Sequence, residues 1–270
     1  MTRTLLQEIL SEGGLSTLFQ PIFEIDGQGT SLFALEALSR GPKGSNAERA
    51  DVLFEYVRRK EKEPEVDRAC LVSALQACGS IAADCAISIN VHAATLERDT
   101  QFPEFLADVA GSSGVPLSRL ILEIVEQQKY SDAQRFFNTI DRLRSAGVGI
   151  ALDDIGLGYS NYRMLVEIHP DFFKIDRYFV AGSSEKPNAR AAIESIVLLA
   201  DRLGGRAIAE GIESASDLQS VLGLGINLAQ GYYLMPPSPA PSLEPQKLNT
   251  SLNRETRRRV NGTQENSARR

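Results

Sequence analysis

Cysteine and histidine are scarce in this chain, and their scarcity excludes several kinds of site. Cys70, Cys78 and Cys85 are the only cysteines among 270 residues, and the chain has two histidines. No two cysteines form a Cys-x-x-Cys pair, so neither a zinc–thiolate centre nor a framework of disulfides is expected. Because an odd number of thiols without such a framework is typical of a reducing compartment, we expect a cytoplasmic protein.

Long apolar runs are also missing. No segment approaches the roughly 18–20 consecutive apolar residues that span a membrane. The first residues, MTRTLLQE, lack the apolar stretch of a signal peptide. The formal net charge is −6, which does not indicate a surface for DNA or RNA polymers. With 43% hydrophobic and 24% charged residues, the composition fits one large α/β domain or two small ones.

Two β-like runs, residues 15–25 and 30–38, open the chain and are joined by Asp26-Gly27-Gln28-Gly29. So short a connection predicts an antiparallel hairpin, because parallel strands need a crossover of a dozen residues or more. Beyond the hairpin, apolar runs alternate with segments whose apolar residues recur at helical spacing, one of them capped by Ser131. Strands are expected at 85–91, 120–125, 148–153, 171–175, 206–209 and 226–234, and helices at about 50–60, 65–78, 102–110, 132–146, 191–203 and 216–222, with a short helix ending near 167.

Two hairpin strands and six later strands make eight. Strands that alternate with helices predict a parallel sheet covered by helices, and eight of them favour closure. The expected fold class is α/β, a modified (β/α)8 TIM-like barrel with an antiparallel first strand. An open doubly wound sheet is the alternative, but no Gly-x-Gly-x-x-Gly motif follows the first strand. We expect the barrel within residues 1–242 and a polar, arginine-rich, disordered tail at 243–270.

Two adjacent carboxylates, Asp153 and Asp154, close the strand expected at 148–153. Neighbouring side chains on a regular strand point to opposite faces, so both face one site only if the strand ends there and the chain bends. Gly156 and Gly158 would supply that bend. Two carboxylates forced together repel, and a hard divalent cation is the simplest compensation. A helix cap or a surface turn is the alternative explanation.

Polar residues lie at the carboxyl ends of all expected strands except the first, the edge at which such barrels carry their working residues. A charge beside apolar runs is costly unless it is paired or metal-bound, and a structural ion pair or loop cap is the alternative for each residue singly. Oxygen ligands suit Mg²⁺ or Mn²⁺ rather than zinc. With Asp153 between two cations they would form a two-metal centre that activates water and stabilises the leaving oxygen of a phosphoester. The residues are Glu36, Asn90, Glu123, Asp153, Asp154, Lys174, Glu210 and Gln230.

Spacing by two adds further expectations. Lys174 and Asp176 share a strand face, which would let the aspartate hold the lysine charged. Glu36, Leu38 and Arg40 likewise share a face, and the guanidinium of Arg40 could bind a phosphate oxygen.

Motifs along residues 15–238 resemble, in the same order, those of the EAL-domain phosphodiesterases that hydrolyse cyclic di-GMP. The signature stands at Glu36-Ala37-Leu38, within a Glu-x-Leu-x-Arg pattern that ends at Arg40. The resemblance implies that one phosphodiester is opened to give linear pGpG with two Mg²⁺ or Mn²⁺ ions, in a homodimer. The other matching motifs are FQPI at 19–22, SINV at 88–91, LEIVE at 122–126, ALDD at 151–154, KID at 174–176, AEGIE at 209–213 and QGY at 230–232.

The resemblance also implies a role for each site residue. The two metals would be held by Glu36, Asn90, Glu123 and Asp153 and by Asp153 and Asp154, with Glu210 as a base or water ligand. Lys174 would position the attacking water, and Gln230 would support the centre. Substrate contacts would come from Gln20, Leu38, Arg40, Tyr233 and Pro237, while Glu126 and Glu213 would steady the loop after Asp154.

That loop departs from the family pattern at Ile155, Leu157 and Asn161. Because the family loop is associated with dimer contacts and metal occupancy, the departures concern regulation more than chemistry. His92 stands where serine is usual. It shares a face with Asn90 and could line the pocket, although a loop histidine without a role is the simpler interpretation.

Two other functions stay open at this point. One is a non-catalytic receptor of cyclic di-GMP that signals through protein contacts, although such receptors usually lose a metal ligand and none is missing here. The other is a barrel lyase or racemase of enolase type with Lys174 as its base, but the barrel leaves no length for the capping domain of those enzymes. We expect no sensory domain before the barrel, so regulation would come from dimerisation, the altered loop, the tail or a separate protein.

Overall fold

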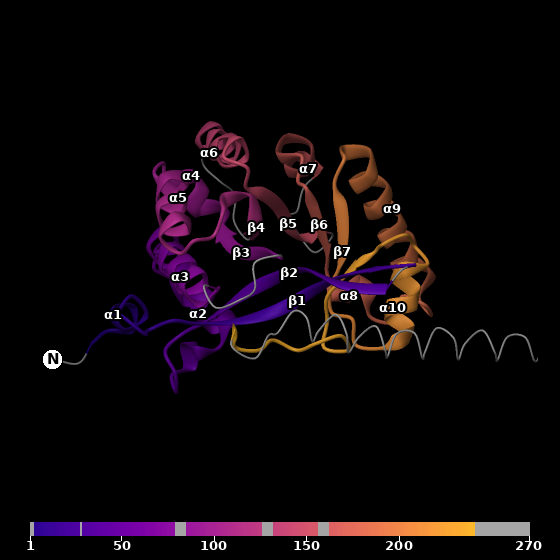
Figure 1. Cartoon of the computed structure of the whole chain (residues 1–270), viewed down its shortest axis with the longest axis horizontal. Coiled ribbons are helices and arrows are strands. Elements are labelled where there is room, and N and C mark those ends of the chain that lie inside the picture. The colour runs from indigo at the N-terminus through magenta and orange to yellow at the C-terminus, as the bar shows by residue number, and fades with distance from the viewer. Residues whose placement is uncertain (1–2, 28, 79–84, 126–131, 156–161, 241–270) are drawn as a thin grey trace, which may run out of the picture.

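The computed structural model describes residues 3–27, 29–78, 85–125, 132–155 and 162–240, and its strands close into a barrel in sequence order (Figure 1). β1 runs antiparallel to both β2 and β8, and every other neighbouring pair is parallel. The expected barrel with an antiparallel first strand is thus confirmed. The strands are β1 Ser16–Asp26, β2 Gly29–Arg40, β3 Ala86–His92, β4 Leu120–Val125, β5 Gly149–Ile155, β6 Phe172–Ile175, β7 Arg206–Ala209 and β8 Leu228–Ala229.

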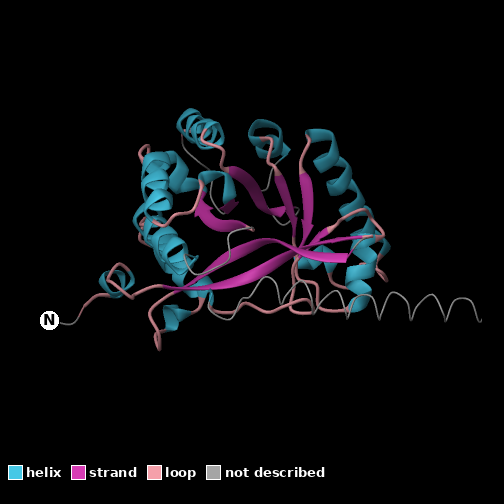
Figure 2. Ribbon diagram, in the orientation of Figure 1, coloured by secondary structure: helices cyan, strands magenta, loops and turns pink. Residues whose placement is uncertain are grey.

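Helices cover the outside of the strands (Figure 2). The helices longer than eight residues coincide with the predicted periodic segments, whereas α1, α4 and α8 were not predicted because one turn or two cannot display a helical period. None of the described helices is long and apolar enough to cross a bilayer. The helices are α1 Leu5–Ile9, α2 Ala50–Arg59, α3 Glu63–Cys78, α4 Ala93–Arg98, α5 Phe102–Ser112, α6 Ala133–Ser145, α7 Tyr162–Ile168, α8 Arg177–Val180, α9 Pro187–Leu203 and α10 Ala215–Leu222, with 3-10 turns at Asn46–Glu48 and Leu117–Arg119.

The start of α6 differs from the prediction by one residue. The side chain of Asp132 accepts a hydrogen bond from the amide of Arg135 at 3.1 Å, so Asp132 is the cap. Ser131, the predicted cap, lies outside the described residues. One face of the helix buries Phe136, Ile140 and Leu143 against the barrel, which is the periodicity that identified the helix in the sequence.

The last strand is much shorter than predicted. β8 covers two residues, whereas 226–234 was expected. After Ala229 the chain leaves the sheet and folds back on the segment that follows β7, where Ile212 exchanges backbone hydrogen bonds with Gln230 and Tyr233 at 3.0 Å. A Cβ at Gly231 would lie 2.2 Å from the carbonyl oxygen of Ile212, so only glycine permits this approach. The apolar residues Ile226, Leu228 and Ala229 are buried as their character predicts, but the strand is shorter than the apolar run.

Candidate active site

An apolar layer inside the barrel lies directly beneath the polar residues of the site. Six side chains from six strands form it: Ile22, Ala34, Ile121, Ala151, Ile208 and Leu228. Because side chains alternate between the faces of a strand, the position two residues further toward the same mouth also faces the interior. Those positions hold Gln20, Glu36, Glu123, Asp153, Glu210 and Gln230. Alternation therefore brings six of the predicted residues to one mouth of the barrel.

Lys174 on β6 stands at the centre of this group and is 1% exposed. Its Nζ lies 2.5 Å from Glu123 and 2.7 Å from Glu210. Glu36 and Asp153 are each 3.4 Å away. Burial alone would lower the pKa of Lys174, but the surrounding carboxylates, led by Asp153, raise that pKa well above its usual value. Lys174 therefore keeps its positive charge and pairs with four carboxylates.

Asp176, expected to hold this lysine, has a different partner. β6 ends at Ile175, so the alternation on which the expectation rested no longer applies at 176. Asp176 is instead the cap of α8, and its Oδ1 accepts a hydrogen bond from the amide of Tyr178 at 2.7 Å. The ion pairs of Lys174 come from other strands.

Amide and hydroxyl side chains fix the two buried glutamates. Glu36 accepts hydrogen bonds from Asn90 at 3.1 Å and from Gln230 at 2.6 Å. Burial opposes its charge, but Lys174 and these two donors hold the pKa of Glu36 below its usual value. Glu123 accepts a hydrogen bond from the hydroxyl of Ser88 at 2.5 Å, a contact that the sequence analysis missed. Burial, reinforced by the charge of Glu36, raises the pKa of Glu123 to about 8.

The two aspartates come together by a different route from the predicted one. β5 continues through both of them to Ile155, and its pairing with β6 is irregular between Leu152 and Ile155. Asp154 itself adopts the left-handed conformation, with φ of 53°, which aspartate tolerates better than most residues. The prediction that the strand ends at the pair is therefore wrong, and the bend lies at Asp154. Gly156 and Gly158, the predicted bend, lie outside the described residues.

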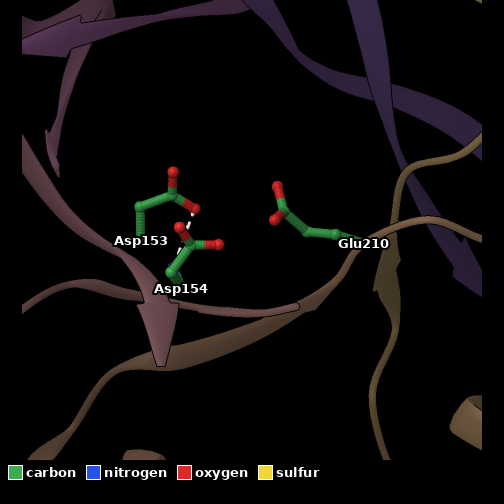
Figure 3. Close-up of side chains that lie close together, drawn as sticks. All are labelled: Asp153, Asp154 and Glu210. Carbon is green, nitrogen blue, oxygen red and sulfur yellow. Dashed lines mark hydrogen bonds between the residues drawn. The ribbon is translucent and has the colours of Figure 1, made fainter. Parts of the chain in front are cut away.

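Asp153, Asp154 and Glu210 point toward one another (Figure 3), and one oxygen from each lies within 4.8 Å of the others. The amide of Asp154 donates a hydrogen bond to Asp153 at 3.0 Å. Burial and the charge of Asp153 raise the pKa of Asp154 to about 6. Burial also raises the pKa of Glu210 well above its usual value, against the opposing charge of Lys174. Within the described residues, these three carboxylates lie close enough together to share a metal ion.

The composition of the site fits divalent cations. Five carboxylates lie around one ammonium group, so carboxylates are in excess. Burial first, and then the neighbouring carboxylates, raise the pKa values of Glu123, Asp154 and Glu210. The nearby donors are oxygen and amide groups, which hard cations prefer. In addition, the buried Oε1 of Gln230 has no hydrogen-bond partner within the described part of the chain. The residues present could therefore hold Mg²⁺ or Mn²⁺.

Two cavities open onto these residues. The larger, of about 510 Å³, has Glu36, Asn90, Asp153 and Asp154 in one wall and Leu38, Arg40, Phe54, Arg58 and His92 in the rest. The smaller, of about 290 Å³, lies beside Glu210 and Gln230 and includes Gln20, Asp176, Glu213 and Tyr232. A wider hollow over α8 and the start of α9 reaches Asp176 but none of the clustered carboxylates.

The remaining predicted residues are distributed as follows. Gln20 pairs with Glu36 across the hairpin, and its Nε2 donates to the carbonyl of Met235 at 3.2 Å. Tyr233 packs against a hydrophobic cluster, whereas its neighbour Tyr232 is 68% exposed. Pro237 is half-buried, beside a backbone pairing between β1 and Ser238. Glu213 forms an ion pair with Arg177 at 2.9 Å. Glu126, Leu157 and Asn161 lie outside the described residues, and Ile155 is buried.

His92 has a partner that the sequence did not indicate. Its Nδ1 lies 2.8 Å from Asp67, and its amide donates to the same carboxylate at 2.9 Å. Burial works against protonation, but the charge of Asp67 raises the pKa of His92 above its usual value. Asp67 lies on α3, and no motif connects α3 with β3, so the partnership is visible only in the fold. His92 is therefore the last residue of β3 rather than a loop residue, and it lines the larger cavity.

Comparison with known proteins agrees with the motifs. Residues 3–237 match the family model described as the EAL domain. The chain belongs to the EAL domain family. Cyclic di-GMP phosphodiesterase PA2567 of Pseudomonas aeruginosa is 34% identical over 158 residues, which cover 58% of this chain and 27% of that protein. The chain thus spans about a quarter of the length of this relative.

Solved EAL structures have the same fold. A standalone versatile EAL protein from Vibrio cholerae O395, in its c-di-GMP bound form, has a TM-score of 0.74 at 23% identity, over 83% of this chain and 92% of that chain. A manganese and c-di-GMP complex of Klebsiella pneumoniae BlrP1 has a TM-score of 0.74 at 24% identity, over 83% of this chain and 56% of that chain. At such identities the likeness establishes the barrel of this EAL domain and nothing finer.

Proposed function

We propose that this EAL domain is a metal-dependent phosphodiesterase that hydrolyses cyclic di-GMP to linear pGpG. The observation that carries the proposal is the mouth of the barrel, where Lys174 lies within 3.4 Å of four carboxylates, three on other strands and one directly after β7. The names of PA2567 and of the two solved complexes support the choice of substrate. No predicted metal ligand is missing from the sequence.

Two Mg²⁺ or Mn²⁺ ions would complete this centre. Bound there, they would acidify a coordinated water and offset the charge that develops on the leaving oxygen. Their binding would also remove the repulsion among the carboxylates that the protein leaves uncompensated. One ion would be held by Glu36, Asn90, Glu123 and Asp153, and the other by Asp153 and Asp154.

The protein's own groups would orient the water and move its proton. Lys174, held by carboxylates on several sides, would fix the attacking oxygen. Glu210, which lies 2.7 Å from Lys174 and beside Asp153 and Asp154, is placed to accept the proton. The water oxygen would form a bond to phosphorus as the bond from phosphorus to the 3′ oxygen breaks, and that oxygen would take up the proton from Glu210 and leave as a hydroxyl. Gln230 would keep Glu36 aimed through their 2.6 Å hydrogen bond, and a catalytic role for Asp176 stays a prediction.

Substrate contacts are proposed for the walls around this centre. Arg40 lines the larger cavity beside Glu36 and would bind a phosphate oxygen through its guanidinium. Leu38 lines the same cavity, and Gln20 lines the smaller one. Contacts from Tyr233 and Pro237, steadying of the loop by Glu126 and Glu213, and a homodimer remain predictions.

The proposal is tested by measuring Mn²⁺-dependent turnover of cyclic di-GMP. Wild-type protein is expected to produce pGpG, and Glu36→Gln is expected to lose at least about a hundredfold in kcat, because it removes a charge from the centre. Glu24→Gln is the matched control, since Glu24 pairs with Arg206 through a separate ion pair. Saturable binding of cyclic di-GMP without hydrolysis, across several Mg²⁺ and Mn²⁺ concentrations, would contradict the enzyme and favour a non-catalytic receptor of cyclic di-GMP.

A further inference from the structure

One face of α2 forms a wall of the larger cavity. Asp51, Phe54, Glu55 and Arg58 line the cavity together, and their spacing of three, four and seven residues places them on the same side of the helix. Glu36, Asp153 and Asp154, which are proposed to bind metal, line the same cavity from the strand ends. A ligand that occupies this cavity therefore contacts this face of α2 as well as the carboxylates.

Arg58 is the cation of this face, and it is not paired with a carboxylate within the described residues. The neighbouring Arg59, by contrast, is within 3.8 Å of Glu55, one turn earlier on α2. Arg59 does not line the cavity, whereas Arg58 does and is half-buried. A guanidinium held at a cavity wall without an acid is suited to bind an anionic oxygen.

The aromatic ring of Phe54 is held in place by a polar latch. The rings of Phe54 and His92 pack at 5.4 Å between centroids with a 59° tilt. His92 is fixed in turn by two hydrogen bonds to Asp67, and the hydroxyl of Thr95 donates a third to that carboxylate at 2.5 Å. Asp67 is 3% exposed, so the latch is buried, and Phe54 presents an apolar surface to the cavity.

We propose that Phe54 and Arg58 form a subsite for the half of the cyclic dinucleotide that does not react. Arg58 binds an oxygen of the second phosphodiester, and the ring of Phe54 packs against the purine of that half. Asp67 and His92 are positioning residues that hold the ring of Phe54. The inference rests on the proposed function, because it takes the carboxylate cluster as the place where the first phosphodiester is cleaved.

The test compares Arg58→Gln with Arg59→Gln, which removes the same charge one residue away. Arg58→Gln is expected to raise KM for cyclic di-GMP roughly tenfold with kcat changed less than twofold, because one charge-assisted contact is lost. Arg59→Gln is expected to match wild type. Bis(p-nitrophenyl) phosphate has a single phosphodiester and no second half, so its turnover should be the same in all three proteins. Equal KM values for Arg58→Gln and wild type, or an equal rise in Arg59→Gln, overturn the subsite.

A conservative variant distinguishes whether Arg58 binds a phosphate oxygen or the guanine base. Arg58→Lys keeps the charge and is expected to recover most of the affinity, because lysine binds phosphate as a point charge. Recognition of guanine by a two-pronged contact would not tolerate lysine at this site, so failure of the rescue overturns the phosphate assignment. Binding of cyclic di-GMP by calorimetry provides a second readout. If wild type hydrolyses neither substrate, the proposed function fails, while the affinities of Arg58→Gln and Arg59→Gln still decide the subsite.

Discussion

The Nζ atom of Lys174 lies 2.5 Å from Oε2 of Glu123, and Glu123 is completely buried. Removing one partner of a buried ion pair leaves the other without compensation. Lys174→Met is therefore expected to lower the unfolding free energy of the metal-free protein by about 3–5 kcal/mol. Urea unfolding in EDTA measures this change, with the exposed Lys186→Met as a control. An unchanged midpoint for Lys174→Met would show that the lysine does not hold the carboxylates together.

Divalent metal is expected to stabilise the folded protein. At a concentration of about 100 times its dissociation constant, a ligand that binds only the folded state adds about 2.7 kcal/mol. Thermal unfolding with Mn²⁺ and with EDTA measures the shift, which should shrink in Asp154→Asn because the substitution removes a charged ligand. Asp201→Asn, on the exposed side of α9, should retain the full shift. A shift of equal size in both variants would contradict the assignment of Asp154 as a ligand.

The latch between His92 and Asp67 is expected to contribute to stability as well as to the cavity wall. His92→Ala leaves a buried carboxylate short of a hydrogen-bond donor, at a cost of about 1–3 kcal/mol. The other histidine provides the control. His169 has a φ of 48°, a conformation that asparagine tolerates, so His169→Asn should change the unfolding free energy by less than about 0.5 kcal/mol. Chemical denaturation compares the two, and equal losses would contradict a special role for His92.

Two of the thiols are expected to resist alkylation. Burial raises the pKa of Cys70 to about 12 and that of Cys78 to about 12. Because the thiolate is the nucleophile and only about one thiol in ten thousand is ionised at pH 8, alkylation of the folded protein should be slow. Intact mass after treatment with iodoacetamide, in buffer and in urea, measures the protection. Equal labelling of Cys70 and Cys78 in the two conditions would exclude buried, protonated thiols.

The eight-stranded order and most of the site were predictable because both follow from alternation. Apolar runs between helical segments predict the strands. A residue at the end of such a run faces the same way as the residue two positions earlier, which is the inward direction if that residue is in the core. Glu36, Glu123 and Asp153 each stand two residues beyond an apolar side chain of the barrel interior. The alternation of side chains along each strand is therefore sufficient to predict that these three residues face the interior of the barrel.

The features that sequence did not reveal depend on backbone irregularity or on contacts between distant segments. Asp154 turns inward because its own backbone is left-handed, an outcome that a regular strand pattern cannot express. β6 ends at Ile175, one residue before Asp176, so Asp176 does not share a strand face with Lys174. Asp67 meets His92 across 25 residues, and neither residue belongs to a motif that names the other.

The apolar layer beneath the carboxylates has a consequence for traffic through the molecule. Ile22, Ile121, Ile208 and their companions plug the floor of the barrel with side chains. Under the proposed function, the reactant and its product therefore enter and leave from the mouth of the barrel that carries the carboxylates. The product would have to leave before the next substrate molecule binds. Slow product release would then limit turnover even if hydrolysis itself were fast.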